Sequence, residues 1–160
     1  MEVTPAAVEA ERDWVAERAD VIVPLINEMR ADLASAFDTE VARVDAAEYE
    51  AAVDAVFANG DLAVNVAALT AILRDLDVAA DYPGFVVDEL LGRELAGCLA
   101  GSQPLRLLGE ATFHYADVTT HTEGVAGADD LDAALAAGFQ TRLPGWPWTE
   151  AESPFGVEPR

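Results

Sequence analysis

The sequence predicts a single all-α domain, a helical bundle of about five to six helices over residues 1–140. An extended C-terminal arm, residues 141–160, is expected to follow it. Three observations predict this class: apolar residues recur at helical spacing, capping and stop residues separate the segments, and two of the three tryptophans lie near the C-terminal end. Hydrophobic residues make up 52% of the 160 residues, which is too apolar for a disordered acidic protein and sufficient for one core.

The first predicted helix begins at Thr4 and Pro5, an N-cap followed by a proline in the first turn. An apolar stripe then continues to about residue 36 at the spacing of one helix face. The stripe consists of Val8, Val15, Ala19, Ile22, Ile26, Met29 and Leu33. We therefore expect one long helix with a kink at Pro24, where a backbone hydrogen bond is lost.

Three further helices are expected before residue 102. Asp45 and Glu48 match the capping-box pattern, and the helix they open should end before Gly60. Asp61 is expected to cap the next helix, and Gly101 to stop the one after it. The apolar faces are Leu62, Val66, Leu69, Leu73 and Leu76 in the former, and Val87, Leu90, Leu91, Leu95, Cys98 and Leu99 in the latter.

The next segment carries mixed signals. Residues 105–115 suggest a fifth helix, whereas Val118 and the three threonines that follow it are β-branched and favour an extended chain. The pattern leaves open whether residues 112–122 form helix or strand. Asp129 is expected to cap a short alanine-rich helix after them.

The arm has no helical periodicity, and its prolines favour extended conformations. Its large apolar residues are Leu143, Trp146, Trp148 and Phe155. A segment without a core of its own must either dock these side chains on the bundle or present them to a partner. Docking is favoured for the two tryptophans, and partner contact for the last ten residues. Because aromatic anchors held by prolines bind at low ordering cost, these four residues are the predicted partner-binding site.

The charge balance points to the protein's surroundings. The formal net charge is -21, from Lys+Arg 9 against Asp+Glu 30, and all nine cations are arginines. Carboxylates at this density repel one another over about 10 Å in 0.1 M salt but only about 3 Å in molar salt. We therefore expect a halophile protein, from the high-salt cytoplasm of an organism such as a haloarchaeon; the rival interpretation is an acidic protein that binds cations or a basic partner.

One group of residues has a pattern suited to metal binding. Glu110, His114, Asp117 and His121 would share one face if residues 105–122 formed a single helix, and imidazoles with carboxylates suit zinc, manganese or iron. If the chain is a strand beyond Phe113, the two histidines point to opposite faces and the site does not form. A small metal-dependent helical protein is therefore an alternative function, and hydrated surface residues are the simpler interpretation.

Other chemistry has little support. The sequence lacks a phosphate-binding glycine loop and a serine nucleophile motif, and Cys98 lies in an apolar stretch, so we expect no enzyme and no cofactor. A helix-turn-helix drawn from Leu69 to Leu95 would carry Asp88, Glu89 and Glu94 against a single arginine, which disfavours nucleic-acid binding. An acidic transcription regulator stays a second alternative. Neither an uninterrupted apolar run of membrane-spanning length nor a signal-peptide pattern occurs, so we expect no membrane association.

A helical core with an extended C-terminal arm resembles, in plan only, the connector subunits that join head and tail in tailed virions. The resemblance implies an assembly role, with the arm inserted into a neighbouring subunit. We therefore expect a non-enzymatic structural or interaction subunit of a halophilic particle or oligomer. Its partner would be another protein or a second copy of the chain, in a high-salt cytoplasm or in a virion of a haloarchaeal virus.

Overall fold

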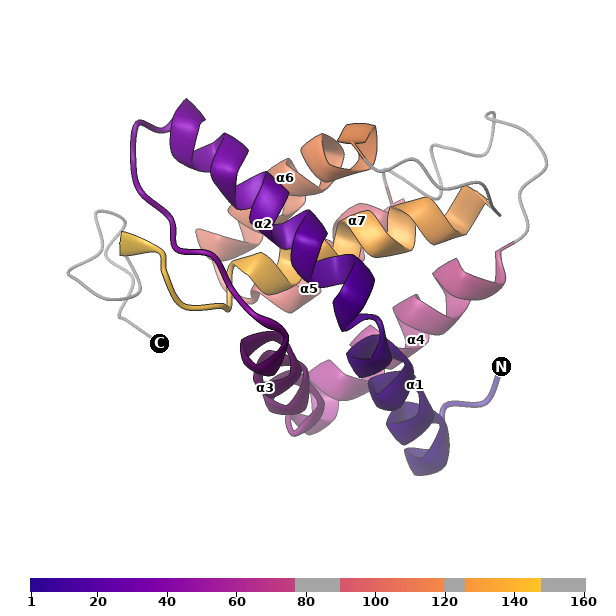
Figure 1. Cartoon of the computed structure of the whole chain (residues 1–160). Helices are drawn as coiled ribbons and strands as arrows, with labels where there is room; N and C mark the ends of the chain where they lie inside the picture. The colour runs from indigo at the N-terminus through magenta and orange to yellow at the C-terminus, as the bar shows by residue number, and fades with distance from the viewer. Residues whose placement is uncertain (77–89, 120–125, 148–160) are drawn as a thin grey trace.

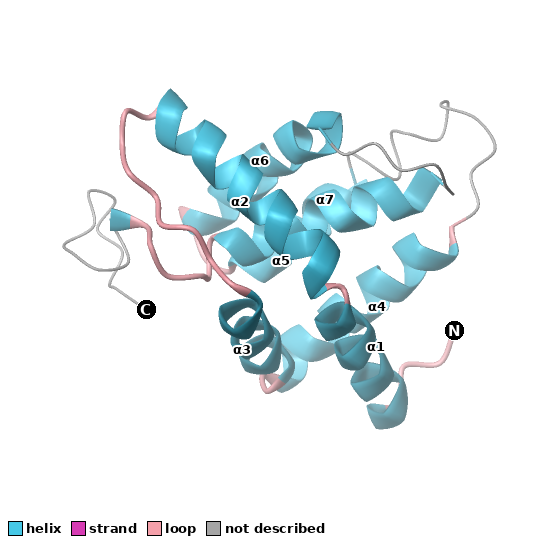
Figure 2. Ribbon diagram, viewed as in Figure 1, coloured by secondary structure: helices cyan, strands magenta, loops and turns pink. Residues whose placement is uncertain are grey.

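The computed structural model of the chain describes residues 1–76, 90–119 and 126–147, and in these residues it is all-helical, as the sequence predicts (Figures 1 and 2). The described helices are α1 (Pro5–Glu17), α2 (Ala19–Ala36), α3 (Ala46–Phe57), α4 (Gly60–Asp75), α5 (Arg93–Ala100), α6 (Leu105–Thr119) and α7 (Ala126–Gln140). The described part thus holds seven helices where about five to six were expected, and one reason is that the predicted first helix is two helices.

Helix α7 is the centre of the molecule. Figure 1 shows it surrounded by α2, α4, α5 and α6, and each of these helices contacts it. Residues 130–141 are all buried, and Leu131, Leu135 and Phe139 supply its bulky core side chains. Because most of its other residues are alanine and glycine, neighbouring helices can approach α7 from several sides at once. The helix that the sequence describes as short and alanine-rich is therefore the core helix.

Glycines set the separation of α5, α6 and α7. A Cβ added at Gly138 of α7 would lie 2.4 Å from the Cβ of Leu99 and 3.0 Å from the carbonyl oxygen of Ala96, both on α5. A Cβ at Gly109 of α6 would lie 2.7 Å from the Cβ of Ala100. These three helices pack at a distance that side chains larger than hydrogen would prevent.

The break after α1 falls at Arg18 instead of Pro24, so the predicted kink is wrong. The carbonyl of Val15 accepts a hydrogen bond from the buried hydroxyl of Tyr49 at 2.8 Å, beside the Arg18 N–H at 3.3 Å. Pro24 lies inside α2 near its N-terminal end. Because proline has no N–H, the carbonyl of Asp20 lacks its helical donor, but Asp20 is exposed to water. The cost of the proline is low there.

The helix caps agree in part with the sequence. The capping box of Asp45 and Glu48 is present, with both hydrogen bonds formed at 2.9 and 3.0 Å. Helix α4 is capped by Asn59, whose side chain accepts from Leu62 N–H at 3.3 Å, and Asp61 lies in its first turn. The expected cap was thus placed two positions too late. Helix α5 ends at Gly101, which has φ 97°, as predicted.

Two bidentate ion pairs connect α1 and its C-cap to the rest of the bundle. Arg18 binds Asp132 of α7 at 2.9 and 2.7 Å, and Arg74 of α4 binds Glu11 at 2.9 and 2.6 Å. Both guanidinium groups also lie over the ring of Trp14, 4.9 and 5.0 Å from its centroid. Burial raises the pKa of Asp132, against the opposing effect of Arg18.

Candidate interaction surface

Helix α6 carries three of the four residues of the predicted metal site. It runs unbroken from Leu105 to Thr119, so the extended alternative is wrong as far as residue 119. The reason is burial: Phe113 and Ala116 are fully buried, and the hydroxyl of Thr112 bonds back to the Leu108 carbonyl at 2.8 Å. Packing of the inner face outweighs the β-branched preference of the sequence.

The Glu110 carboxylate, one turn before His114 on α6, is paired with an arginine. Glu110 forms an ion pair with Arg106 at 2.9 Å, and the His114 ring packs against Phe113 with centroids 5.2 Å apart. In the described part of the chain, no three His, Cys, Asp or Glu side chains come together in a group that could hold a metal ion. His121 lies outside the described residues, so the four-residue site remains a sequence prediction.

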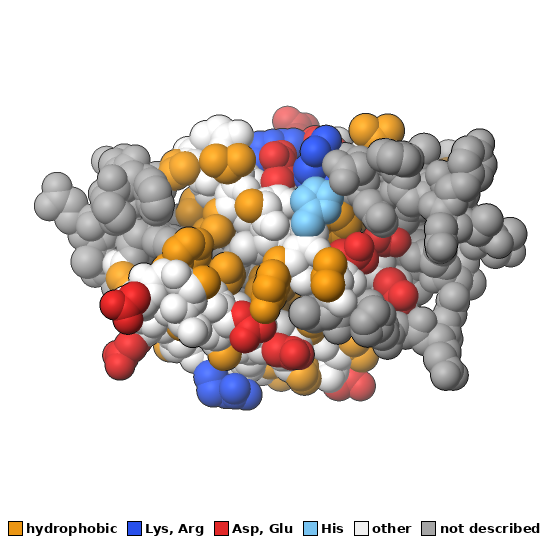
Figure 3. Space-filling model, turned by 90° about the horizontal axis from the view of Figure 1, so that it is seen from above, with side chains coloured by type: hydrophobic (Ala, Val, Ile, Leu, Met, Phe, Trp, Pro, Cys, Tyr) orange, Lys and Arg blue, Asp and Glu red, His pale blue; other side chains and the backbone are white. Residues whose placement is uncertain are grey.

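The outer side of α6 is apolar and exposed. Leu107, Tyr115 and Val118 expose 62%, 43% and 73% of their surface, and Ala111 is also exposed. With the partly exposed His114, these residues form one face, which we call the α6 face: Leu107, Ala111, His114, Tyr115 and Val118. Seen from above, apolar side chains gather over α2 and α6, with acidic side chains around them (Figure 3).

The edge of the α6 face next to α5 is charged and ordered by ion pairs. Arg106 binds Glu94 of α5 at 2.8 Å and Glu110 at 2.9 Å. The hydrogen bond from Arg106 lowers the pKa of the Glu94 carboxyl, and Glu94 in turn raises the pKa of Arg106. Asp117 continues this row two turns beyond Glu110. The two ion pairs of Arg106 thus fix the positions of the Glu94 and Glu110 carboxylates along this edge.

The opposite edge borders α2. The Tyr115 hydroxyl donates to Asp32 at 2.5 Å, and this hydrogen bond is the main cause that raises the Tyr115 pKa. Glu28 lies close enough to raise it further. The α6 face is therefore an apolar strip between an acidic edge on α2 and a mixed edge on α5.

The first part of the predicted arm packs on the bundle. Leu143 is 1% exposed and Trp146 is fully buried, with its indole N–H donating to the Gln140 carbonyl at 3.0 Å. The sequence left open whether these residues dock on the bundle or contact a partner. In the structure both dock on the bundle, and neither exposes surface to a partner. Trp148 and Phe155 lie outside the described residues.

A buried arginine holds this C-terminal segment. Arg30 of α2 is 1% exposed and donates to four backbone carbonyls: Ala42 at 2.7 Å, Pro144 at 2.6 Å, Gln140 at 2.8 Å and Leu143 at 3.0 Å. Its guanidinium carbon lies 5.6 Å from the centroid of the Trp146 ring. Burial lowers the pKa of Arg30 to about 10, so the group stays charged at neutral pH. Nothing in the local sequence distinguishes this arginine from the others.

Arginines elsewhere are also engaged within the chain. Arg12 binds Asp54 at 2.5 Å, and Arg142 donates to the Leu99 carbonyl. With the contacts above, Arg12, Arg18, Arg30, Arg74, Arg106 and Arg142 all bind carboxylates or carbonyls of their own chain. These six arginines lie on α1, its C-cap, α2, α4, α6 and the segment after α7.

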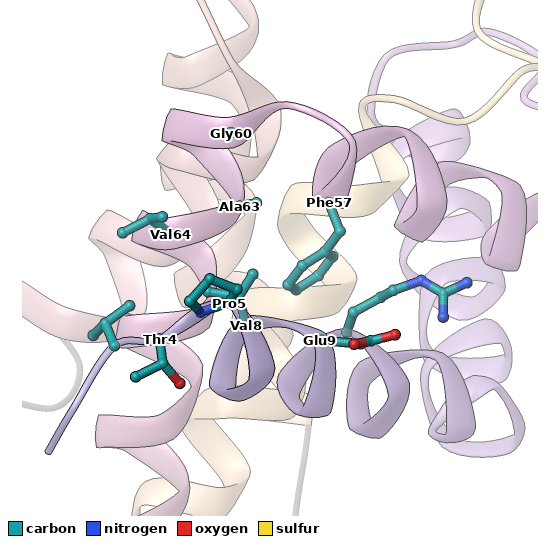
Figure 4. A pocket seen from close by; sticks show the side chains of 10 residues that line it. Thr4, Pro5, Val8, Glu9, Phe57, Gly60, Ala63 and Val64 are labelled. Atoms are coloured by element: carbon teal, nitrogen blue, oxygen red, sulfur yellow. The ribbon is translucent and has the colours of Figure 1, made fainter.

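An apolar groove lies between the start of α1, the end of α3 and the start of α4 (Figure 4). It has a volume of about 510 Å³, and its walls are mainly Val3, Pro5, Val8, Phe57 and Val64. Its charged residues are Glu9 and Arg12, of which Arg12 is paired. Such a groove lacks the convergent polar groups that orient a small-molecule ligand.

Among the described residues, no single helix is both long and apolar enough to span a membrane. Helices α3 and α4 reach that length and apolar character only when they are taken together, and they are bent by 111° relative to each other.

Comparison with known proteins gives a family without an assigned activity. Neither the curated proteins nor the solved structures include a match to this chain. A family model described as "Domain of unknown function (DUF7984)" matches residues 1–159. The chain therefore belongs to the DUF7984 family.

Proposed function

We propose that this protein is a non-enzymatic interaction subunit of an assembly that works in molar salt, and that the α6 face is its contact surface. The observation that carries the proposal is the exposure of Leu107 and Val118 at 62% and 73% on one side of a well-packed helix. High concentrations of salting-out ions raise the cost of exposed apolar surface, so such a face in a halophile favours a partner.

The charge distribution supports the same proposal. The chain has a net charge of -21, yet none of the five residues of the α6 face is a carboxylate. On a chain this acidic, a helix face with five neighbouring uncharged residues is a candidate for a contact surface. An interface supplies that reason, because charged residues are depleted at interface centres.

The C-terminal end adds a second, sequence-based contact. Since Leu143 and Trp146 are buried in the bundle, the partner-binding proposal there rests on Trp148 and Phe155. A connector in a haloarchaeal virus particle is one assembly that this plan would suit, and an oligomer in a high-salt cytoplasm is another.

The proposal is tested by the native mass of the chain in its own salt. A tagged chain, produced in a haloarchaeal host at low level, is expected to elute in molar KCl well above the mass of a monomer. Leu107→Asp with Val118→Asp should shift it toward the monomer, because two carboxylates would be placed in the contact. A chain ending at residue 147 tests the second contact separately.

The matched control is Val3→Asp with Val64→Asp, which adds the same charge at exposed apolar positions before α1 and on α4, each 44% exposed. A wild-type chain that elutes as a monomer in the extract would contradict the proposal. So would a control variant that disrupts the complex as strongly as the α6 variant.

A further inference from the structure

The junction between α3 and α4 holds the only asparagine–glycine pair in the sequence, Asn59 and Gly60. Both residues are exposed to solvent. In such a pair the backbone nitrogen of the glycine can attack the side-chain carbonyl carbon of the asparagine, because glycine has no Cβ to hinder the approach. A Cβ built at Gly60 would meet no atom within 4 Å, so the surrounding structure leaves this side of the glycine open.

We infer that Asn59 is a site of spontaneous deamidation and that the N-cap of α4 limits its rate. The Gly60 nitrogen attacks Cγ of Asn59, a Cγ–N bond forms, and the Cγ–Nδ2 bond breaks as ammonia leaves with the proton of the Gly60 nitrogen. Water then opens the cyclic imide. Addition of water at Cγ gives aspartate, and addition at the backbone carbonyl carbon gives isoaspartate, in which the chain runs through the former side chain. Either product carries one more negative charge than asparagine.

The cap of α4 holds Asn59 in a conformation that prevents this attack. Its Oδ1 accepts from the Leu62 N–H at 3.3 Å, and its backbone has φ -90° and ψ 108°. The imide ring closes only when the Cα–Cβ bond and the C–N bond to Gly60 are nearly eclipsed, which for an L residue lies at negative ψ. The peptide group between Asn59 and Gly60 must therefore turn first. That movement breaks the cap and the 2.7 Å hydrogen bond from Ala63 N–H to the Asn59 carbonyl.

This opening involves few contacts. Gly60 is the first residue of α4, so its N–H has no acceptor within the helix. Opening of an exposed helix end is much easier than unfolding of the domain. Loss of the cap and of one backbone hydrogen bond lowers the reactive population about tenfold to a hundredfold. A requirement for global unfolding would lower it by more than about a thousandfold. The folded chain should therefore react at a rate between these two limits.

The other two asparagines of the chain serve as internal controls. Asn27 is 5% exposed, and its side chain bonds both the N–H and the carbonyl of Val44, at 2.8 and 2.9 Å. Asn65 is exposed, but it lies inside α4 and precedes Val66, whose branched side chain is fully buried. In both cases the backbone nitrogen that would attack is held in a packed helix.

The two products should differ in their effect on the fold. An aspartate at position 59 keeps a cap oxygen, and its charge lies where the dipole of α4 favours it. Isoaspartate adds a carbon to the backbone between α3 and α4, which are bent by 111° relative to each other. Gly60 lies at the edge of the groove between α1, α3 and α4 (Figure 4). The isoaspartate product is therefore expected to disturb the groove, and the aspartate product to leave it in place.

The test follows the amide of each asparagine by peptide mapping and mass spectrometry. Purified full-length chain is incubated in molar KCl, beside a sample unfolded by urea in the same salt. Asn59 should lose its amide in both samples, about tenfold to a hundredfold more slowly in the folded one, and give both products. Asn27 and Asn65 should keep their amides in the folded sample. Equal rates at Asn59 in the two samples would overturn the control by the cap.

The matched variant is Gly60→Ala, which has room for its methyl group and should keep the far-UV spectrum of the wild type. Its loss of amide at Asn59 should be slowed about tenfold in both samples, because the methyl group hinders the attacking nitrogen. Undiminished loss would mean direct hydrolysis of the amide and overturn ring closure. A wild-type folded chain more than about a thousandfold slower than the unfolded one would show that only global unfolding permits the reaction, and would overturn the site in the native fold.

Discussion

At the scale of single residues, Arg30 is the polar group on which the C-terminal segment depends most. One buried guanidinium satisfies carbonyls from the α2–α3 connection, the end of α7 and the segment after it. Hydrogen bonds to a charged donor are worth more than neutral ones, and unpaired buried carbonyls are costly. The interaction thus both compensates a buried charge and orders residues 140–146.

Arg30→Met should lower the free energy of unfolding by about 3 kcal/mol, because four carbonyls lose their charged donor in a buried site. The unfolding free energy of Arg30→Lys should lie between those of the wild type and Arg30→Met, since an ammonium group does not reach four acceptors. The measurement is urea unfolding in molar KCl, followed by tryptophan fluorescence. Arg12→Met, which removes an exposed ion pair, is the control and should change little. Equal losses for Arg30→Met and Arg12→Met would contradict the assigned role.

Tyr49 gives a prediction in alkaline solution. Burial raises the pKa of its hydroxyl well above the ordinary value of 10.0, so the folded state retains the proton at a pH where the unfolded chain has lost it. The stability that Tyr49 contributes is therefore present below pH 10 and is lost as the pH rises above it. Tyr49→Phe should cost about 1 kcal/mol at neutral pH, from the lost bond to Val15.

The gap in unfolding free energy between wild type and Tyr49→Phe should close as the pH rises above 10. Paired urea titrations at neutral and alkaline pH measure it. A gap that stays constant with pH would show that the Tyr49 hydroxyl ionises as easily in the fold as in water.

At the scale of helices, the approach of α5, α6 and α7 is limited by glycine. Gly138→Ala should destabilise the protein by about 2 kcal/mol or more, because the new methyl group would overlap Leu99 and the Ala96 carbonyl. Gly60→Ala at the start of α4 meets no atom within 4 Å and should leave stability unchanged or raise it by about 0.5 kcal/mol. Thermal unfolding in molar KCl compares the two. Similar melting temperatures would mean that α5 and α7 can move apart without cost.

Helix existence was predictable because each described helix carries a local signal. The capping box at Asp45 and the stop at Gly101 are encoded within a few residues of the boundary they set. The break at Arg18 was not predictable, because it involves Tyr49, which lies far along the chain, and because the sequence overstates the effect of Pro24 near a helix end. Local chemistry thus predicts helices better than it predicts where two helices join.

The surface proved harder to predict than the helices. Helix α6 has apolar residues on both sides at helical spacing, such as Phe113 inside and Val118 outside, and periodicity alone does not tell which side is buried. The same limit applied to the arm, because Leu143 and Trp146 look like interface anchors in the sequence. The sequence also gives no sign that Arg30 binds the backbone carbonyls next to them. Only the packed structure distinguishes a core tryptophan from a binding one.

At the scale of the whole molecule, the net charge of -21 predicts a dependence on salt. The chain should lose helicity or compactness below about 0.5 M KCl, where screening no longer limits repulsion between carboxylates. Circular dichroism and small-angle scattering during a KCl titration measure this. Full stability in dilute buffer would reject the halophile interpretation while leaving the packing of the bundle unaffected.

The Arg30 site also bears on how this sequence can drift over generations. The four oxygens that Arg30 binds belong to the backbone, so these hydrogen bonds do not restrict which side chains stand at positions 42, 140, 143 and 144. At position 30, no other residue could reach all four oxygens. A saturation-mutagenesis library selected for folding should therefore be nearly invariant at Arg30 and permissive at Pro144, which is exposed. The side chains at the C-terminal end of the bundle can therefore vary, while Arg30, far away in the sequence, maintains the backbone conformation there.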